Sequence, residues 1–388
     1  LAMNKILISL LSVAFLNACA PEHTGFTFVV VNDLDMDRAF ETVELTGTFL
    51  GVDNLNNYGI QDFETKEVLV SQGVDTDKDQ YADVLLFQPK MKANSKRKFE
   101  LIEIHHSERP KSKSVCYSRF VPERMDDYAW ENDKVAFRVF GPKAQRMAEE
   151  NQEGGTLSSG VDAWLKRVER PIINKWYLKE LNTEGSYHED DGEGLDNFHV
   201  GPSRGVGGLA IKRDSTYHFS KNFSNWQHIT SGPIRTSFYL EYEDWDADGV
   251  LIKESKIISL DKGSNLSKFE VSLEGAEHVA AGITLHEKDG EVKSNLKEGW
   301  LSYWQPHGDS ELGTAIVAPT SVFKDMESYE TDQVDLSNAY AHLQVRNGKV
   351  IYYAGFGWKK SGQFQSQKEW EDYLSQFALK LSKPLKVQ

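Results

Sequence analysis

The chain has 388 residues, a formal net charge of -15 and a pI near 5.3. Nucleic-acid binding relies on lysine and arginine neutralising phosphates, so this acidic balance argues against nucleic acid as a partner. A mean hydropathy of -0.51 is typical of a soluble protein, and the length favours one large β domain with added structure or two packed β layers.

The N-terminal residues have the pattern of a bacterial targeting segment. An apolar run over 6–16 is too short to span a bilayer, and the sequence Leu16-Asn17-Ala18-Cys19 that closes it resembles a lipobox. We therefore expect residues 1–20 to be a lipoprotein signal peptide with Cys19 as the lipidated residue; an ordinary signal cleaved near Ala20 is the alternative. The expected location is the periplasm or the outer membrane, with the lipid anchor as the contact to the membrane. Cys116 is then the one remaining cysteine, which excludes an intramolecular disulfide.

Most of the chain after residue 25 alternates apolar and polar residues with the period of β-strands. Early runs lie over 26–31, 39–45, 68–70, 84–87, 99–104 and 135–140, and a long series follows residue 204. The dipeptides Asp248-Gly249, Asp289-Gly290 and Asn347-Gly348 mark hairpin turns within that series. The pattern predicts an all-β fold, mainly an antiparallel β-sandwich, with residues 26–388 as a single large catalytic domain.

A few peripheral helices are also expected. Pro142 suits the first turn of a short helix over 142–150. Ser159 and Asp162 have capping-box spacing for another short helix, which Pro171 would end. A C-terminal helix begins at the capping box of Ser366 and Glu369, and its apolar residues fall on one stripe that would pack on the sandwich: Trp370, Leu374, Phe377, Ala378 and Leu381.

An acidic loop over 75–83 resembles a calcium-binding loop, with carboxylates at Asp75, Asp77, Asp79 and Asp83. The EF-hand pattern fails, because Gln80 replaces the glycine at its sixth position and Leu86 replaces the glutamate at its twelfth. The sequence favours a solvated hairpin turn over a bound calcium ion.

The stretch from Ser158 to Arg204 has the densest mixture of charged and aromatic residues, interleaved with glycines. It contains none of the GxSxG, HExxH, CxxC or P-loop patterns, so serine-hydrolase, zincin and nucleotide-dependent chemistry have no support. A carboxylated sugar would need such a mixture, because arginine grips carboxylates, aromatic faces stack on sugar rings, and histidine or tyrosine moves protons. The alternative is that the aromatic residues belong to the core and the cations to the surface.

Four segments, SGVDAWLKRVERPIINKWY, YHEDDGEGLDNFHVG, SRGVGGLAI and GPIRTSFYLEY, resemble the family catalogued as domain of unknown function 4861. The resemblance runs from about Phe26 to the C-terminus. It implies a β-sandwich related to the mutarotase-like supersandwich. Family members occur in bacterial polysaccharide-degradation systems, and one resembles an ulvan oligosaccharide dehydratase. The implied reaction removes water from a uronic acid (GlcA or IdoA) at the non-reducing end of an anionic oligosaccharide and leaves a 4,5-unsaturated uronate.

This elimination needs cations beside the uronate carboxylate, a base for the C5 proton and an acid for the departing 4-hydroxyl. Lys175 and Arg204 are the expected cations, and His188 and Tyr187 are expected to move the protons, with His307 as the reserve. The expected substrate-binding residues are Lys166, Arg170, Trp176, Tyr303 and Trp304. No cofactor is expected, although Asp191 and Glu193 offer oxygen ligands for a divalent cation such as Ca²⁺.

Three other functions fit the same residues. A polysaccharide lyase uses the same β-elimination but expels a sugar, a non-catalytic surface glycan-binding lipoprotein would bind without reaction, and an epimerase follows from fold analogy alone.

Overall fold

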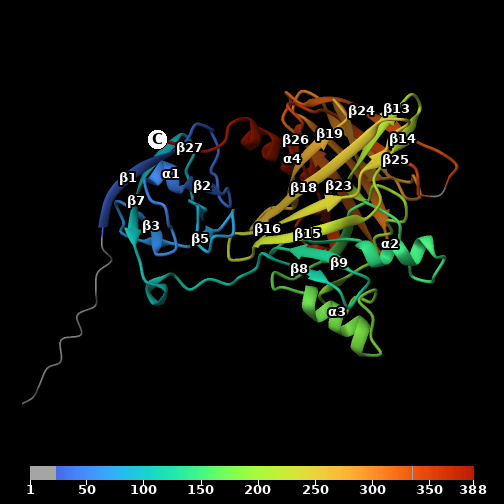
Figure 1. Cartoon of the computed structure of the whole chain (residues 1–388). Helices are drawn as coiled ribbons and strands as arrows, with labels where there is room; N and C mark the ends of the chain where they lie inside the picture. Colours follow the sequence, from blue (N-terminus) through green and yellow to red (C-terminus); the bar gives the residue numbers. More distant parts are fainter. Residues whose placement is uncertain (1–22, 334) are drawn as a thin grey trace, which may run out of the picture.

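The computed structural model describes residues 23–333 and 335–388, so the predicted signal segment 1–20 and its Cys19 lie outside the described residues. The described chain forms two β units side by side, a smaller N-terminal unit and a large sandwich (Figure 1). Within this part of the chain, no helix has both the length and the apolar character needed to cross a membrane.

The N-terminal unit contains two small antiparallel sheets. The first has the order β27 (Lys386–Val387), β1 (His23–Asn32), β7 (Ser95–Glu103), β3 (Tyr58–Asp62) and β4 (Val68–Leu69). The second has the order β2 (Val43–Thr46), β6 (Val84–Phe87) and β5 (Ser71–Val74), and the single-turn helix α1 (Gly47–Leu50) follows β2. The two sheets enclose a hydrophobic core of their own, in which Phe28, Phe87 and Phe99 contact one another.

The sandwich contains three further sheets. One has the order β12 (Gly194–Leu195), β11 (Asp162–Lys166), β10 (Ala136–Val139), β9 (Asp127–Glu131) and β8 (Tyr117–Val121). Another has the order β14 (Thr216–His218), β13 (Val206–Arg213), β20 (His278–Thr284), β25 (Asn338–Gln344) and β24 (Phe323–Tyr329). The largest has the order β15 (Phe223–Thr230), β16 (Arg235–Tyr242), β18 (Leu251–Asp261), β19 (Leu266–Glu274), β26 (Lys349–Trp358), β23 (Ser310–Val317), β22 (Trp300–His307) and β21 (Glu291–Asn295), with β17 (Trp245–Asp246) pairing to β18.

A single large core joins these three sheets. Phe137 of β10, Leu209 of β13 and Phe356 of β26 all belong to it, although each comes from a different sheet. All the strand pairings between named strands are antiparallel. The predicted all-β fold, mainly an antiparallel sandwich with a few helices, is therefore confirmed; its relation to the mutarotase-like supersandwich stays a prediction.

The helices lie at the periphery of the sandwich (Figure 1). Helix α2 (Pro142–Glu149) and the C-terminal helix α4 (Gln367–Ser382) confirm the prediction. The hydroxyl of Ser366 accepts a hydrogen bond from the backbone N–H of Glu369, and Trp370, Leu374 and Ala378 of α4 are buried. Short 3-10 turns occur at η1 (His106–Glu108) and η2 (Lys359–Ser361).

One local prediction was wrong. The segment expected to form a helix from the capping box at Ser159 is the buried strand β11, and the helix of this region, α3 (Ile173–Asn182), begins after Pro171. The strand buries Asp162 and Lys166 because each finds a partner of opposite charge, Arg138 on β10 and Glu131 on β9. The carboxylate of Glu131 also accepts the backbone N–H groups of Ile172 and Ile173, which start α3.

Candidate functional site

Two adjoining pockets flank the loop Asp196–His199, which follows β12. The first, of about 730 Å³, is lined by Arg124, Arg138, Asp162, His188 and Asp196 among others. The second, of about 680 Å³, is lined by His286, Gln305, His307, Asp335 and their neighbours. Both pockets are lined by Asn197 and His199, so the loop forms the boundary between them.

The loop is fixed at its N-terminal end by its backbone and in the middle by a buried ring. Leu195 pairs with Leu165 of β11, and the N–H of Asp196 donates to the carbonyl of Tyr187 at 2.9 Å. Gly194 has φ 108°, and a Cβ there would lie 1.9 Å from the carbonyl oxygen of Leu165, so glycine is required for this pairing. Phe198 is buried in the large core, which leaves its neighbours Asn197 and His199 exposed.

His188 lies in the first pocket with one ring nitrogen already bound. Its Nδ1 is 2.5 Å from the carbonyl oxygen of Asp196, so Nδ1 carries the proton and donates it. The side chain is 56% exposed, and its Nε2 is the nitrogen that remains to exchange a proton with a ligand. The ring packs edge-on against Tyr187, with 4.6 Å between centroids.

His307 ends β22 in the second pocket. Its Nε2 lies 3.1 Å from the side-chain oxygen of Asn197, and its ring centroid is 6.0 Å from that of His286. Burial, together with the neighbouring His286, lowers the pKa of His307 to about 4. His307 is therefore a neutral imidazole at neutral pH, with Nδ1 as the acceptor when Nε2 donates to Asn197.

His286 supports the loop and has no free ring nitrogen. Its Nε2 donates to the carbonyl of His199 at 2.8 Å, and its Nδ1 accepts from the amide of Gln305 at 2.9 Å. Burial lowers the pKa of His286, which keeps this neutral pattern of donor and acceptor. His199 itself is bound to the carboxylate of Asp335 at 2.9 Å.

A buried cluster of charges forms the floor of the first pocket. Arg138 donates to Asp162 and Asp196 at 2.5 and 2.9 Å and to the hydroxyl of Tyr187 at 3.1 Å. Burial raises the pKa of Asp162 to about 7, helped by the like charge of Asp196 and opposed by Arg138. The second oxygen of Asp162, Oδ1, is buried and has no hydrogen-bond partner in the part of the chain that the structure describes.

The structure brings together only part of the predicted site. His188 and His307 lie in the adjoining pockets, and Tyr187 lies beneath His188 but is 2% exposed. Arg204 is fully buried away from both pockets, where it donates to Ser159 and to the carbonyls of Leu209 and Pro202. Desolvation lowers the pKa of Arg204 to about 10.

The remaining predicted residues are bound to other parts of the protein. Lys175 and Arg170 both pair with Glu193, and Asp191 pairs with Lys179 at 3.4 Å. The other four are buried: Lys166 against Glu131, Trp176 beside Trp164, Tyr303 with its hydroxyl on the carbonyl of Leu285, and Trp304 in the cluster around Trp370. None of these eight residues lines the two histidine pockets.

The acidic loop has the single close group of metal-binding side chains among the described residues, at Asp75, Asp77 and Asp83. Its oxygens already serve the turn: both oxygens of Asp75 accept backbone N–H groups, from Lys78 and Gln80, and Asp83 accepts from Thr76. This arrangement fits a self-capped turn, and a calcium ion there stays a hypothesis.

Sequence reasoning missed Arg124, Arg138, Asp162, Asn197 and His286 as pocket residues. Asp162 and Asn197 lay inside the predicted stretch. Pairing of β10 with β11 brings Arg138 beside Asp162, and Arg124 and His286 lie on loops next to β9 and β20. Their place at the pockets depends on contacts between segments that are distant in sequence, for which a single sequence has no local signal.

The fold and the pockets define an antiparallel β-sandwich protein with a histidine-lined cleft. The chain belongs to the family described as "Domain of unknown function (DUF4861)", whose model matches residues 30–387. "Uncharacterized protein P7" of Formosa agariphila is 51% identical over 376 residues, which cover 96% of this chain and 95% of that relative.

Two solved structures from Enterococcus faecalis share a distant likeness. One is a protein in the glycosyl hydrolase family 38 (TM-score 0.48, 12% identity), and the other is an alpha-mannosidase (TM-score 0.46, 11% identity). Each match covers 93% of this chain, which spans about half the length of those proteins, 47% and 45% respectively.

Proposed function

We propose that the protein is a carbohydrate-active dehydratase that eliminates water from the non-reducing-end uronic acid of ulvan-type oligosaccharides. The observation that carries the proposal is that consecutive residues, Asp196 and Asn197, hold His188 and His307 in adjoining pockets. An elimination requires two proton carriers on one substrate, and two histidines held by one loop are our candidates for that pair. The substrate class comes from the family resemblance.

His307 is the base in this proposal. A base must be unprotonated before it can act, and the lowered pKa of His307 keeps its imidazole neutral at neutral pH. With Nε2 directed at Asn197, the Nδ1 lone pair takes the proton from C5 of the uronate.

His188 is the acid. In this step His188 starts as an imidazolium with a proton on each ring nitrogen. The electrons of the C5–H bond form the C4=C5 double bond, the C4–O bond breaks, and the departing hydroxyl takes the proton from Nε2 and leaves as water. His188 is left neutral, with its remaining proton on Nδ1. The hydrogen bond from Nδ1 to the carbonyl of Asp196 fixes the ring so that Nε2 faces the pocket.

Arg124 takes the role first predicted for Lys175 and Arg204. The C5 proton is acidic enough only when the charge that develops on the adjacent carboxylate meets a cation placed in advance. Arg124 lines the pocket of His188, and within the described part of the chain its guanidinium bonds to Asp127 alone, from Nη1 at 3.3 Å. The other nitrogens of its guanidinium are left to bind the uronate.

The test is incubation of the full chain with uronate-ended ulvan oligosaccharides, followed by absorbance of the conjugated double bond and by mass spectrometry for loss of one water. His188→Ala and His307→Gln should each lower kcat by about 10²–10⁴-fold. His278→Gln is the matched control, because His278 is exposed on β20 and lines neither histidine pocket. The proposal would be contradicted if ulvan, alginate and glycosaminoglycan fragments all failed to give an unsaturated product.

The same assay separates the alternatives. A polysaccharide lyase would produce the double bond together with shorter chains, whereas the dehydratase leaves the number of sugars unchanged. A glycan-binding lipoprotein would bind the oligosaccharide saturably, give no product and keep its affinity in both histidine variants.

A further inference from the structure

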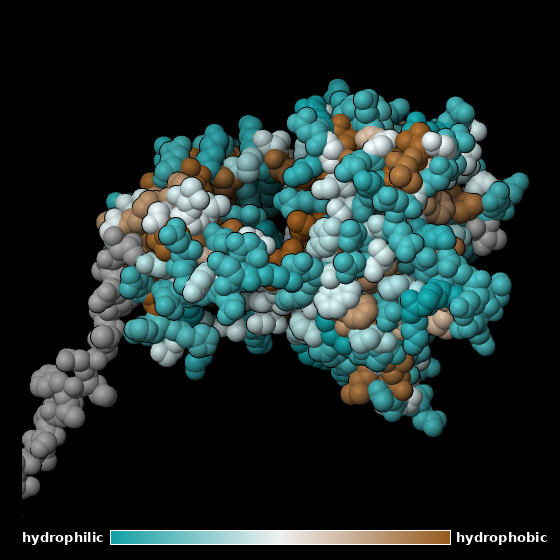
Figure 2. Space-filling view, in the orientation of Figure 1, coloured by the Kyte–Doolittle hydropathy of each residue, from teal (hydrophilic) through white to brown (hydrophobic). Residues whose placement is uncertain are grey.

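We propose that a third pocket, at the junction of the N-terminal unit and the sandwich, binds an acidic sugar residue. The pocket has a volume of about 370 Å³, within the range of roughly 300–1,000 Å³ that is usual for ligand sites. Its walls come from the segment 39–44, from β16, β18, β19 and β26, and from α4. Figure 2 shows a hollow between the two units with hydrophobic surface on its sides. It contains no histidine among its lining residues and is separate from the proposed catalytic cleft.

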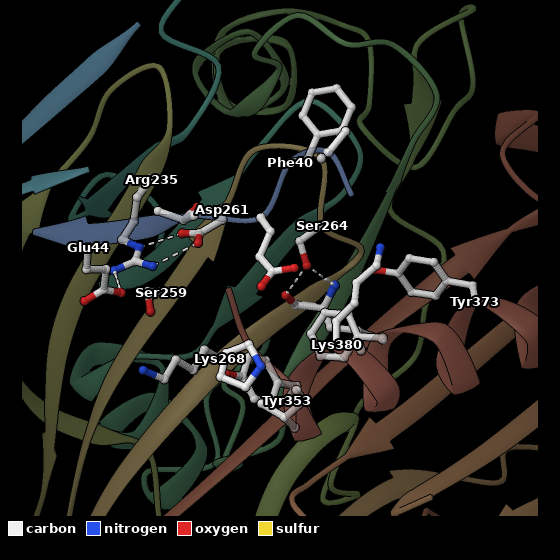
Figure 3. Close-up of a pocket in the computed structure, with 18 residues that line it drawn as sticks. Phe40, Glu44, Arg235, Ser259, Asp261, Ser264, Lys268, Tyr353, Tyr373 and Lys380 are labelled. Atoms are coloured by element: carbon white, nitrogen blue, oxygen red, sulfur yellow. Dashed lines mark hydrogen bonds and ion pairs between the residues drawn. The ribbon is translucent and has the colours of Figure 1, made fainter. Parts of the chain in front are cut away.

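Most charged groups of this junction pocket are already neutralised. Arg235 binds Asp261 through two nitrogens and Glu44 through the third, as the dashed lines of Figure 3 show. Glu41 is held by two hydrogen bonds from Arg38, and Lys268 pairs with Glu270 at 3.0 Å. These groups shape the walls but have little charge left for a ligand.

Lys380 is the exception. Its ammonium group has no ion pair within 4.0 Å and no hydrogen bond among residues 23–333 and 335–388, and its side chain lies partly buried on α4. Desolvation lowers its pKa, although the more distant Glu41 opposes the shift. A cation that has lost water without gaining a partner attracts an anion strongly, so the free charge in this pocket selects a negatively charged ligand.

The other free groups are suited to a sugar. The hydroxyls of Tyr353 and Ser259 make no hydrogen bond to any described residue, and both line the pocket. Tyr353 and Phe377 pack edge to face at 5.0 Å, which leaves aromatic surface toward the cavity. In Figure 3, Tyr353 and Lys380 lie on the same side of the pocket. One cation, hydroxyl groups and aromatic faces together match a ring with an acidic group, hydroxyls and an apolar C–H face.

Phe40, from the N-terminal unit, lies at the rim of the junction pocket. Its backbone has φ 57°, a left-handed conformation that is unfavourable for a bulky residue, and its ring is 52% exposed although it packs over Gly263. Backbone strain of this kind persists where the surroundings enforce it, and ligand clamps are one such place. A bound sugar would contact both units at once.

The experiment measures binding to the full chain with His188→Ala, so that turnover does not consume the probe. A glucuronic-acid-ended tetrasaccharide is titrated by calorimetry, and the neutral probe cellotetraose is titrated in parallel. Adding Lys380→Met should weaken the junction site roughly tenfold or more, since a hydrogen bond to a charged group is lost, while Lys380→Arg should retain it. Lys368→Met is the matched control on the same helix, because Lys368 is 79% exposed and lies outside the pocket.

Unchanged affinity in Lys380→Met, with a thermal unfolding curve like that of the control, would overturn the inference. If cellotetraose bound as tightly as the glucuronic-acid-ended tetrasaccharide, the inference that the site selects an acidic sugar would be overturned. The result is distinguishable from that of the proposed function, which is assayed separately on the chain with His188 intact. Absence of unsaturated product from that protein, with binding that depends on Lys380, refutes the dehydratase alone. Product formation by that protein, with no role for Lys380 in binding, refutes the junction site alone.

Discussion

His188 and His307 are held by consecutive residues of one loop, although they lie far apart in the sequence. The carbonyl of Asp196 holds Nδ1 of His188, and the side-chain oxygen of Asn197 holds Nε2 of His307. A shift of this loop would therefore move both rings together.

The first prediction concerns Asn197 as the positioning residue for His307. Asn197→Ala removes the acceptor at 3.1 Å and lets the ring of His307 rotate, so kcat should fall by about tenfold to a hundredfold with a smaller change in KM. Asn197 is exposed, so the melting temperature should change little. Asn174→Ala, an exposed asparagine on α3, is the control; a variant of Asn197 with full activity would contradict the assigned role.

The second prediction concerns the acid side of the pH profile. Because the pKa of His307 is lowered to about 4, the base stays unprotonated and kcat/KM should fall only as the pH drops through that value. Asn197→Asp places a carboxylate beside the ring, which favours the imidazolium, so this fall should move to higher pH. The check is kcat/KM over pH 3.5–8 for both proteins, and an unshifted profile would show that His307 is not the base.

The third prediction concerns stability and Asp162. Its pKa is about 7 in the folded protein and about 3.8 in an unfolded chain, so the folded state binds more protons between those values. The contribution of Asp162 to the free energy of unfolding should therefore decrease from pH 4 to 7 and stay constant above pH 7.

Asp162→Asn tests this contribution. Asparagine has the shape of the protonated acid and can still accept a hydrogen bond from Arg138, so the free energy of unfolding of the variant should lack the decrease between pH 4 and 7. In urea denaturation, the free energy of unfolding of the variant minus that of the parent should rise from pH 5 to 7. Parallel pH profiles of the two proteins would contradict the shift.

The fourth prediction separates packing from catalysis at Arg204. Its guanidinium satisfies the carbonyls of Leu209 and Pro202 and lies over the ring of Phe219 at 3.7 Å. Arg204→Ala should lower the free energy of unfolding by about 2–5 kcal/mol through a cavity and unsatisfied carbonyls, with kcat/KM per folded molecule unchanged. A stable but inactive variant would restore the catalytic role that the sequence suggested.

Local patterns predicted the parts of the fold that depend on neighbouring residues. The hairpin at Asp248-Gly249 and the capped helix α4 were predictable from a few adjacent residues. Asn347-Gly348 forms a tight turn, but the predicted hairpin there was wrong because its flanking strands β25 and β26 lie in different sheets. The hairpin predicted at Asp289-Gly290 was wrong for the same reason, since β20 and β21 lie in different sheets. The helix expected at Ser159 was wrong because burial of Asp162 and Lys166 depends on Arg138 and Glu131, which are distant in sequence.

The candidate site was predictable only in part for the same reason. The mixture of charge and aromatics pointed to His188, and the end of a strand pointed to His307. The cations of the stretch looked available because their partners were not apparent: Glu193 neutralises both Lys175 and Arg170. Which charges remain without a partner among the described residues is a property of the folded arrangement, as Lys380 shows.

The pairing of β27 with β1 has a consequence for the order of folding. Val29 exchanges two backbone hydrogen bonds with Gln388, and Arg38 donates to the carbonyl of Lys383. The outer edge of β1 thus stays open during synthesis until the residues that follow α4 have left the ribosome. An open strand edge is prone to wrong pairing, so the N-terminal unit is exposed to mispairing until β27, which follows α4, covers that edge.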